Sequence, residues 1–298
     1  MKEKIFYRYV PLKKRVNGKV VDKLGKLRTL KILKNNMFYF SYPYEFNDPF
    51  DGRQFCHFEG NKDEWRAHYN KEKDEIKRKQ SLDLMESINY DPKRIDEMYK
   101  FVNNDNRYHY IVYCLSELND SILMWTHYAS QHSGLCLGFK STNEDGKYYL
   151  DMEEKVNLFN PTHKALLSKV QYQDSYPNIV NPVKNKNYSY ESFQLAKSQS
   201  WEYEKEYRVL IHSKSFNCYK NKYKKRSFKF KREILSEVIF GIRMEYAEMK
   251  EISDIVTDIY INQGIDVKLY KAKMNEYNYG INFEPFEAKN PLKFRWNL

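Results

Sequence analysis

The sequence predicts an α+β fold, with a mixed or antiparallel central sheet, flanking helices and a helical insertion. Three observations lead to this prediction. Strand-like and helix-like segments alternate irregularly, without a repeat period. Neither a Gly-x-Gly-x-x-Gly loop nor a Walker loop is present, which argues against a standard nucleotide-binding sheet. Residues 62–103 are strongly charged with sparse apolar anchors, which is typical of helices inserted into one domain, here spanning 1–298.

The first half of the chain begins with a strand and a helix. Residues 5–10 are rich in β-branched and aromatic residues, which favours a strand. Leucines recur every three residues over 24–33, which indicates a helix that Asn35-Asn36 can end in a left-handed conformation. A short aromatic strand, a loop and two helices follow, over 37–41, over 42–52 and within 62–103, where Asp91-Pro92 separates the helices.

In the second half of the chain, alternation of apolar residues indicates strands and helical spacing of apolar residues indicates helices. Apolar, alternating runs predict strands over 108–115, 134–139, 169–172, 206–212, 237–240 and 267–270. Helical spacing predicts helices over 122–130, 190–201 and 246–262. The run Asn119-Asp120-Ser121 offers an N-cap to the first of these helices.

The composition indicates a globular chain with an excess of positive charge. Hydrophobic residues make up 41% and charged residues 31%, a mixture that argues against disorder. Lys and Arg number 51 against 40 Asp and Glu, and the resulting +11 favours phosphate-bearing partners but equally fits a solvated, lysine-rich surface. No apolar run approaches the ~18 residues of a membrane helix, and 1–10 lacks the apolar core of a signal peptide. We therefore expect a cytoplasmic protein that does not associate with membranes.

The cysteines do not predict a metal site. The four of them are widely spaced and form no Cys-x-x-Cys pair. His132 and Cys136 could face one ion, but no third or fourth ligand is visible near them, so no metal is expected.

An acidic triplet, Glu204-Lys205-Glu206, leads into the predicted strand 206–212. Alternation along an extended chain places Glu204, Glu206 and Arg208 on one face. Two carboxylates beside one guanidinium can have well-separated pKa values, which acid–base and cation-stabilising sites require. The same residues could instead form a structural ion network on an edge strand.

Two other segments could line a pocket. Trp125 and His127 lie on the predicted helix 122–130, where the histidine could carry protons or orient a substrate, or be a partly buried structural side chain. Asn47 and Asp48 can bond nearby backbone amides and stiffen the turn 46–51. That stiff turn could be a pocket wall or simply a turn.

The segment 219–232 combines positive charge with aromatic rings. It contains eight basic residues, four aromatic residues and no acid. Basic side chains neutralise phosphates and aromatic rings stack on unpaired bases, so Lys222, Lys224, Lys225 and Arg226 could contact RNA or DNA from a hairpin. A solvated hairpin whose rings face the sheet explains the same pattern.

Seven blocks of the sequence carry a family resemblance. They are Tyr7-Arg8-Tyr9, residues 37–41, FNDPFD at 46–51, residues 113–116, LMWTHYASQHSGLCLGF at 123–139, WEYEKEYRVLI at 201–211 and IFGIR at 239–243. In this order they resemble a bacterial family known as domain of unknown function 2971. The resemblance spans nearly the whole chain and brings no established activity. A role in phage defence or stress response is an expectation that goes with it.

A more remote resemblance concerns the order of a few polar residues. A strand carrying Arg8, a helix ending at residues 32–33, a strand ending at Ser41 and a late Glu-x-Glu strand are similar to ADP-ribosyltransferases. In those enzymes a basic or histidine residue, a serine or tyrosine and a catalytic glutamate follow one another in this order. Two features depart from the pattern: the Ser-Thr-Ser signature of arginine-specific members is absent, and the 62–103 insertion is atypical.

This second resemblance implies NAD as co-substrate. Arg8 would contact its phosphates or ribose, and Ser41 would buttress the nicotinamide, with Tyr39 or Tyr42 as a stacking face. Glu206 or Glu204 would bond the nicotinamide-ribose hydroxyl, where an ionised carboxylate stabilises the positive charge that develops as the glycosidic bond breaks.

Two functions therefore compete. The first is an ADP-ribosyltransferase-like enzyme that modifies RNA, DNA or a protein; its nucleotide pocket is built from Arg8, Ser41, Asn47, Trp125, His127, Glu204 and Glu206. The second is a non-catalytic nucleic-acid-binding protein that uses 219–232. The enzyme requires its early and late side chains to converge in one cleft.

Overall fold

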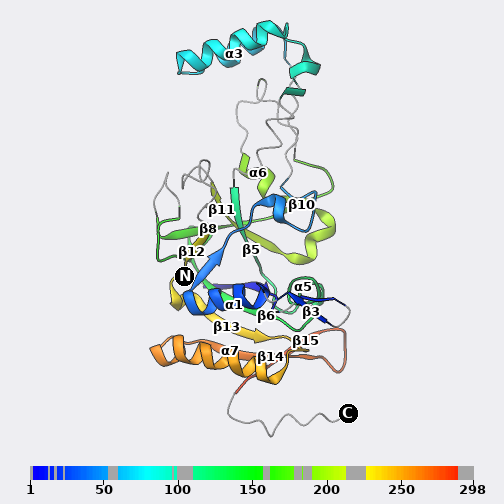
Figure 1. Ribbon diagram of the computed structural model, residues 1–298, viewed down its shortest axis with the longest axis vertical. Coiled ribbons are helices and arrows are strands. Elements are labelled where there is room, and N and C mark those ends of the chain that lie inside the picture. Colours follow the sequence, from blue (N-terminus) through cyan, green and yellow to red (C-terminus); the bar gives the residue numbers. More distant parts are fainter. Residues whose placement is uncertain are drawn as a thin grey trace.

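A large sheet with helices around it forms the centre of the molecule, which we describe from a computed structural model (Figure 1). The structure describes residues 3–12, 14–16, 19–22, 24–52, 60–95, 97–98, 110–156, 162–177, 183, 190–212 and 226–287. The predicted α+β fold, with a mixed sheet and flanking helices, is confirmed.

The central sheet has nine strands within the described residues. In spatial order they are β1 (Lys4–Val10), β5 (Tyr110–Ser116), β11 (Glu206–His212), β8 (Lys164–Lys169), β7 (Lys147–Asp151), β6 (Leu135–Glu144), β13 (Leu235–Phe240), β14 (Lys268–Met274) and β15 (Ile281–Pro285). The β13–β14 pair is parallel and the other pairs are antiparallel.

The first strands of this sheet close on themselves. β6 pairs with β1 and β13 along its first part and with β7 at 142–144, so β1, β5, β11, β8, β7 and β6 form a ring. Alternate side chains of these strands, such as Phe6, Leu137 and Val209, point into the ring and form the main core. The residues between them point outward, where polar groups can gather.

The flanking helices follow the sequence pattern closely. The helix α1 (Leu24–Asn35) ends at Asn36, whose φ of 43° is the left-handed conformation that the Asn-Asn pair predicts. The helix α7 (Tyr246–Ile259) packs against α1, and the Tyr260 hydroxyl donates to the Leu33 carbonyl at 2.8 Å. The helix α5 (Ile122–Tyr128) begins at its predicted N-cap Ser121.

The charged segment contains the helices α2 (Lys62–Tyr69) and α3 (Glu75–Ser87), and Figure 1 shows α3 at one end of the molecule. A separate core of Trp65, Met85, Tyr90 and Ile95 holds these helices together. The prediction of one break near Asp91-Pro92 was incomplete, because the chain also breaks at 70–74, where the Asp74 carboxylate accepts from two backbone amides and starts α3. The last residues of the predicted insertion, 99–103, lie outside the described residues.

The predicted helix 190–201 is wrong beyond its first turn. The helix α6 (Tyr190–Gln194) is followed by the strand β10 (Ala196–Ser198) and the 3-10 helix η3 (Gln199–Glu204). β10 pairs in parallel with β9 (Gln171–Gln173), so strand pairing with a distant segment overrides the local helical pattern. This interruption places Lys197 inside the candidate site described below.

Smaller elements complete the fold. They are β2 (Lys14–Val16), β3 (Lys19–Asp22), β4 (Met37–Tyr39), β12 (Ser227–Lys229) and the 3-10 helices η1 (Pro43–Glu45), η5 (Arg232–Ile234) and η6 (Ile261–Gln263). Within the described segments no helix has both the length and the apolar character that a bilayer crossing needs.

Candidate functional site

A cavity of about 330 Å³ lies where β1, β5 and β11 meet the turn 41–51 and the helix α5. This volume falls within the range of small-molecule sites, roughly 300–1,000 Å³. The polar or ionisable side chains around it are Tyr7, Arg8, Tyr9, Ser41, Glu45, Asn47, Asp51, Cys114, Ser116, His127, Tyr128, Lys197, Glu204 and Glu206. The structure therefore brings Arg8, Ser41, Asn47, His127 and both predicted glutamates to one cavity.

Strand alternation alone would separate the early arginine from the late glutamate. Along β1, alternation places Arg8 on the core side of the sheet, with Phe6 and Val10. Along β11 it places Glu206 on the outer side, because the next residue, Tyr207, points into the core. The two reach one cavity because β1 and β5 separate. In the described part of these strands they pair only at Tyr7 and Ser116.

The segment at Ser41 occupies the place that β1 leaves beside β5. Ser41 and Val112 exchange backbone hydrogen bonds of 2.9 and 2.8 Å. Arg8 reaches the same gap, where its Nη1 donates to the Cys114 carbonyl at 2.8 Å. In the order β1-β5-β11, β5 lies between the strands that carry Arg8 and Glu206, and both side chains line the same cavity.

The two glutamates come from different elements, which corrects the prediction of an extended chain through 204–206. Glu204 ends η3, and the strand begins at Glu206. Lys205 between them has left-handed dihedrals, φ 43° and ψ 53°. This turn directs both carboxylates to the same ammonium group, that of Lys197.

Arg208 anchors the ionic network through Asp51 and Glu206 without lining the cavity itself. Its side chain is fully buried, and all five of its N–H groups have acceptors. Two N–H groups meet Asp51 at 2.8 and 2.6 Å, two meet Glu206 at 2.9 and 3.0 Å, and one meets the Gln194 carbonyl at 2.6 Å. Such a fork fixes both carboxylates in position.

Lys197 joins the three acids. Its Nζ donates to Glu204 and Glu206, the latter at 3.0 Å, and lies 3.6 Å from Asp51. Burial alone would lower the pKa of Lys197, but the carboxylates around it hold that pKa well above its usual range. The buried cluster thus contains three carboxylates and two cations, which leaves one negative charge at the cavity wall when all are ionised.

The two glutamates have opposite pKa shifts. Burial would raise the pKa of Glu206, but Arg208 and Lys197 outweigh burial and hold it far below its usual range. Burial, the largest cause, and the charge of Glu206 raise the pKa of Glu204, whereas Lys197 and the hydrogen bond from Tyr128 oppose the increase. Glu206 therefore holds its negative charge more strongly, and Glu204 is the carboxyl that is easier to protonate.

Tyr128 holds the free side of Glu204. Its hydroxyl donates to Glu204 Oε1 at 2.6 Å and accepts from the Asn47 amide at 3.4 Å. Burial, and then the charge of Glu204, raise the pKa of Tyr128, so the hydroxyl stays a donor at neutral pH. A ligand hydroxyl that enters the cavity can take the place of this donor.

We expect Tyr128→Phe to raise the pKa of Glu204 further, because the lost hydrogen bond favours the ionised form. The loss should also destabilise the fold by about 1–2 kcal/mol. Carboxyl titration by NMR and denaturant unfolding measure the two effects. Tyr203→Phe in the same 3-10 turn is the control, because Tyr203 does not line the cavity. An unchanged Glu204 titration would contradict this assignment.

Arg8 is the cation available to a ligand. It is half-buried and packs over the Tyr113 ring at 5.0 Å. Among the described residues no carboxylate pairs with it, and its buried Nε has no hydrogen-bond partner. A guanidinium in this state, across the cavity from an acidic cluster, can bind a phosphate or carboxylate.

Three predicted residues lie elsewhere than expected. Trp125 is fully buried, its indole N–H donates to the Asn119 carbonyl at 2.7 Å, and it packs behind Tyr9 without lining the cavity itself. Tyr39 and Tyr42 do not line the cavity either. Their rings face the Arg226 guanidinium, at 4.8 and 5.1 Å. None of the three therefore lines the cavity.

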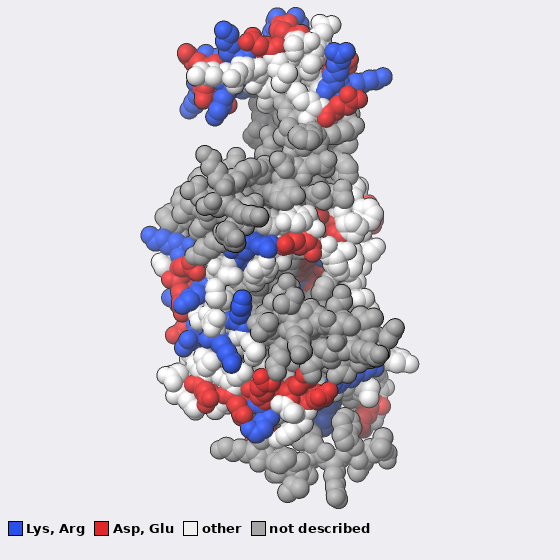
Figure 2. All heavy atoms as spheres, in the orientation of Figure 1, with Lys and Arg blue, Asp and Glu red and all other residues white. Residues whose placement is uncertain are grey.

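The structure describes the second half of the basic segment 219–232, from Arg226 onward. Lys222, Lys224 and Lys225 lie outside the described residues. Arg226 is described, and it pairs with Glu45 at 2.6 Å. Figure 2 shows basic and acidic side chains interspersed over α3 and the coloured part of the body on the face in view, so no basic field extends over them.

The sequence alone did not single out Lys197 or Tyr128, and it did not predict that Asp51 pairs with Arg208. Lys197 lies on a three-residue strand with no local pattern. Tyr128 shares the helix α5 with His127, which is exposed at the cavity rim. Asp51 ends the turn that contains Asn47, and this position was the one available signal.

Two further observations concern the Cys114 thiol at the cavity and the grouping of side chains that could bind metal. Burial raises the pKa of Cys114 well above its usual range, so this thiol stays protonated at neutral pH. The described residues contain no group of three or more side chains arranged to hold a metal ion.

One family model matches the chain. It is that of DUF2971, a protein family of unknown function, and it covers residues 124–209. This segment supplies Tyr128, Lys197, Glu204, Glu206 and Arg208, whereas Arg8 and Ser41 precede it. No curated protein and no solved structure matches the chain. The resemblance to DUF2971 is therefore confirmed over the segment that carries the acidic wall of the cavity.

Proposed function

We propose that the chain is an NAD-dependent, ADP-ribosyltransferase-like enzyme that binds the nicotinamide-ribose end of NAD in this cavity. The observation that carries the proposal is the arrangement of charges. Arg8, a guanidinium that no described carboxylate pairs with, lines the same cavity as two glutamates whose pKa values are shifted in opposite directions. The proposal places the reaction in the cytoplasm, where NAD and macromolecular acceptors occur together.

Each side of the cavity would perform one part of the reaction. Arg8 would bind a phosphate of NAD by charge-assisted hydrogen bonds, and Ser41 would support the nicotinamide. The bond between nicotinamide and ribose breaks, and neutral nicotinamide leaves with the bonding electrons. A nucleophile of RNA, DNA or a protein then bonds to the ribose carbon and loses its proton to Glu204 or to water.

Glu204 fits the reacting carboxylate better than Glu206. Both oxygens of Glu206 are held by Arg208 and Lys197 and cannot meet a ligand without losing those bonds. Glu204 has one cationic partner, and its other oxygen faces the exchangeable Tyr128 hydroxyl. In its ionised form Glu204 would stabilise the positive charge on the ribose in the transition state.

The test is NAD binding and nicotinamide release by the full chain, with RNA, DNA and protein acceptors. A ligand that binds only the native state raises the unfolding temperature. Arg8→Gln should weaken NAD binding about 10- to 150-fold, the effect of a lost hydrogen bond between charged groups. Arg66→Gln, on the exposed face of α2, is the control and should leave the affinity unchanged. Failure of the parent chain to bind NAD, or to release nicotinamide with any acceptor, would end the proposal.

The alternative function, nucleic-acid binding without catalysis through 219–232, depends on the sequence pattern. The same experiment separates it, because that function predicts salt-sensitive retention of polynucleotide without nicotinamide release.

A further inference from the structure

A second cavity, of about 580 Å³, adjoins the first. The two share Asn47 and Lys197 in their walls. The second is built from the turn 47–50, the segment 173–177 and the segment 196–201. The two cavities therefore meet at these two side chains.

Aromatic rings dominate this second cavity. Phe50 is 64% exposed and Tyr176 is 42% exposed, and both rings line it together with Trp201. The backbone at Phe50 is anchored, since its N–H donates to Asp48 Oδ1 at 2.9 Å and the next residue, Asp51, is held by Arg208. A large ring on an anchored turn, in an exposed position, offers a face to a planar ligand.

Lys197 connects the two cavities electrostatically. Its ammonium lies 5.1 Å from the centre of the Trp201 ring while it bonds Glu204 and Glu206 on the other side. Lys197 is the sole cation among the described residues that line the second cavity, and its charge is already paired. The cavity is therefore unsuited to a phosphate group.

The other polar groups of this cavity are neutral except for the carboxylates of Asp48, which accepts from the Phe50 N–H, and Asp174. Gln173, Ser198 and Ser200 supply amide and hydroxyl groups, and a carboxylate can accept from the amino group of a base. Stacking on aromatic rings combined with neutral hydrogen-bonding groups is the way proteins bind unpaired bases.

We infer that the second cavity is a nucleobase subsite of the enzyme. This inference rests on the proposed function, because it assigns the base to the substrates of that reaction. The base can come from two sources, the adenine of NAD or an unpaired base of a nucleic-acid acceptor. In either case Phe50 and Trp201 supply the stacking faces.

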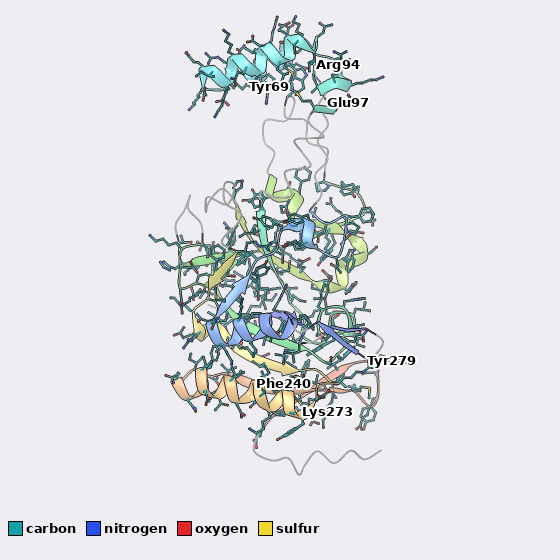
Figure 3. All side chains as sticks on the ribbon, in the orientation of Figure 1. Tyr69, Arg94, Glu97, Phe240, Lys273 and Tyr279 are labelled. Atoms are coloured by element: carbon teal, nitrogen blue, oxygen red, sulfur yellow. The ribbon has the colours of Figure 1, made fainter. Side chains whose placement is uncertain are left out.

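The test compares Phe50→Ala with the parent chain in binding adenosine, NAD and a short oligothymidylate. Phe50 is mostly exposed, so the fold should not depend on its ring. Loss of one stacking face should weaken base binding about 5- to 150-fold. Tyr279→Ala is the matched control: this exposed aromatic residue lies in the β14–β15 turn, far from β10 (Figures 1 and 3), and its loss should change nothing. Ribose 5-phosphate, which has no base, should bind parent and variant alike.

The pattern of losses identifies the source. Weaker adenosine and NAD binding with unchanged oligothymidylate binding assigns the subsite to the co-substrate, and the reverse assigns it to the acceptor. Equal binding of all three ligands by Phe50→Ala and the parent, or no binding of adenosine and oligothymidylate by the parent, would overturn the inference. Adenosine and oligothymidylate contain no nicotinamide, so their binding tests the subsite separately from the reaction. If the chain binds these bases but releases no nicotinamide from NAD, the transfer reaction is refuted and the subsite remains.

Discussion

Arg208→Met should lower the free energy of unfolding by about 3–5 kcal/mol. The guanidinium is fully buried and neutralises Asp51 and Glu206, which are 4% and 4% exposed. Methionine has a similar length but no charge, so both carboxylates would remain buried with Lys197 as their only cation. Urea unfolding followed by circular dichroism measures the loss.

The control for this experiment is Lys164→Met, which removes a cation from an exposed pair with Glu144. Exposed pairs contribute about 0–1 kcal/mol, so this variant should unfold almost as the parent does. Adding Asp51→Asn to Arg208→Met should recover part of the stability, because it removes one of the unpaired charges. If Arg208→Met lowered the free energy of unfolding by less than about 1 kcal/mol, water would have to reach the ion network more than its burial indicates.

Local patterns predicted the fold where local forces decide it. The periodic leucines and the Asn-Asn stop gave α1, and Ser121 gave the start of α5. The prediction failed over 190–201, because β10 owes its conformation to pairing with β9 rather than to its own residues. The strands β7 and β15 were not predicted at all; each is stabilised by its neighbours in the sheet.

The candidate site was predictable in its residue types but not in its connections. The turn at Asn47 and the glutamates at 204 and 206 stand out in the sequence, and they line one cavity. Asp51 and Arg208, however, are 157 positions apart, and nothing near either residue indicates that they pair. Lys197 joins the site only because the predicted helix is interrupted there. The same limitation explains why Trp125, Tyr39 and Tyr42 were assigned to the pocket: aromatic residues near polar ones could equally belong to the walls.

Glu204→Gln should strongly lower kcat while leaving NAD binding close to that of the parent. Glutamine keeps the shape of the side chain and can still bond Tyr128, but it has no charge to stabilise a cationic ribose. Loss of one electrostatic partner of the transition state typically costs about 100- to 1,000-fold in kcat. Glu202→Gln, in the same 3-10 turn but exposed and paired with Lys205, is the matched control and should retain full activity.

The effect of pH on stability distinguishes Glu204 from Glu206 independently of activity. The folded-state pKa of Glu204 is raised, so its contribution to stability is complete below the unfolded-state pKa, about 4.5, and is lost as pH rises through the folded-state value. Glu204→Gln cannot ionise, and its stability relative to the parent should therefore increase over that interval. The pKa of Glu206 is lowered, so its contribution is present above about 4.5 and is lost only as pH falls through its folded-state value.

Glu206→Gln should consequently destabilise the protein at neutral pH, since it leaves Arg208 with one carboxylate instead of two. The two variants thus separate reaction from structure: Glu204→Gln loses turnover with its stability intact, and Glu206→Gln loses stability. Full turnover in Glu204→Gln, together with a folded but inactive Glu206→Gln, would transfer the reacting role to Glu206. Such a result would require a ligand hydroxyl to displace Lys197 or Arg208 from Glu206. Both oxygens of that carboxylate already accept hydrogen bonds from these two side chains, which opposes the displacement.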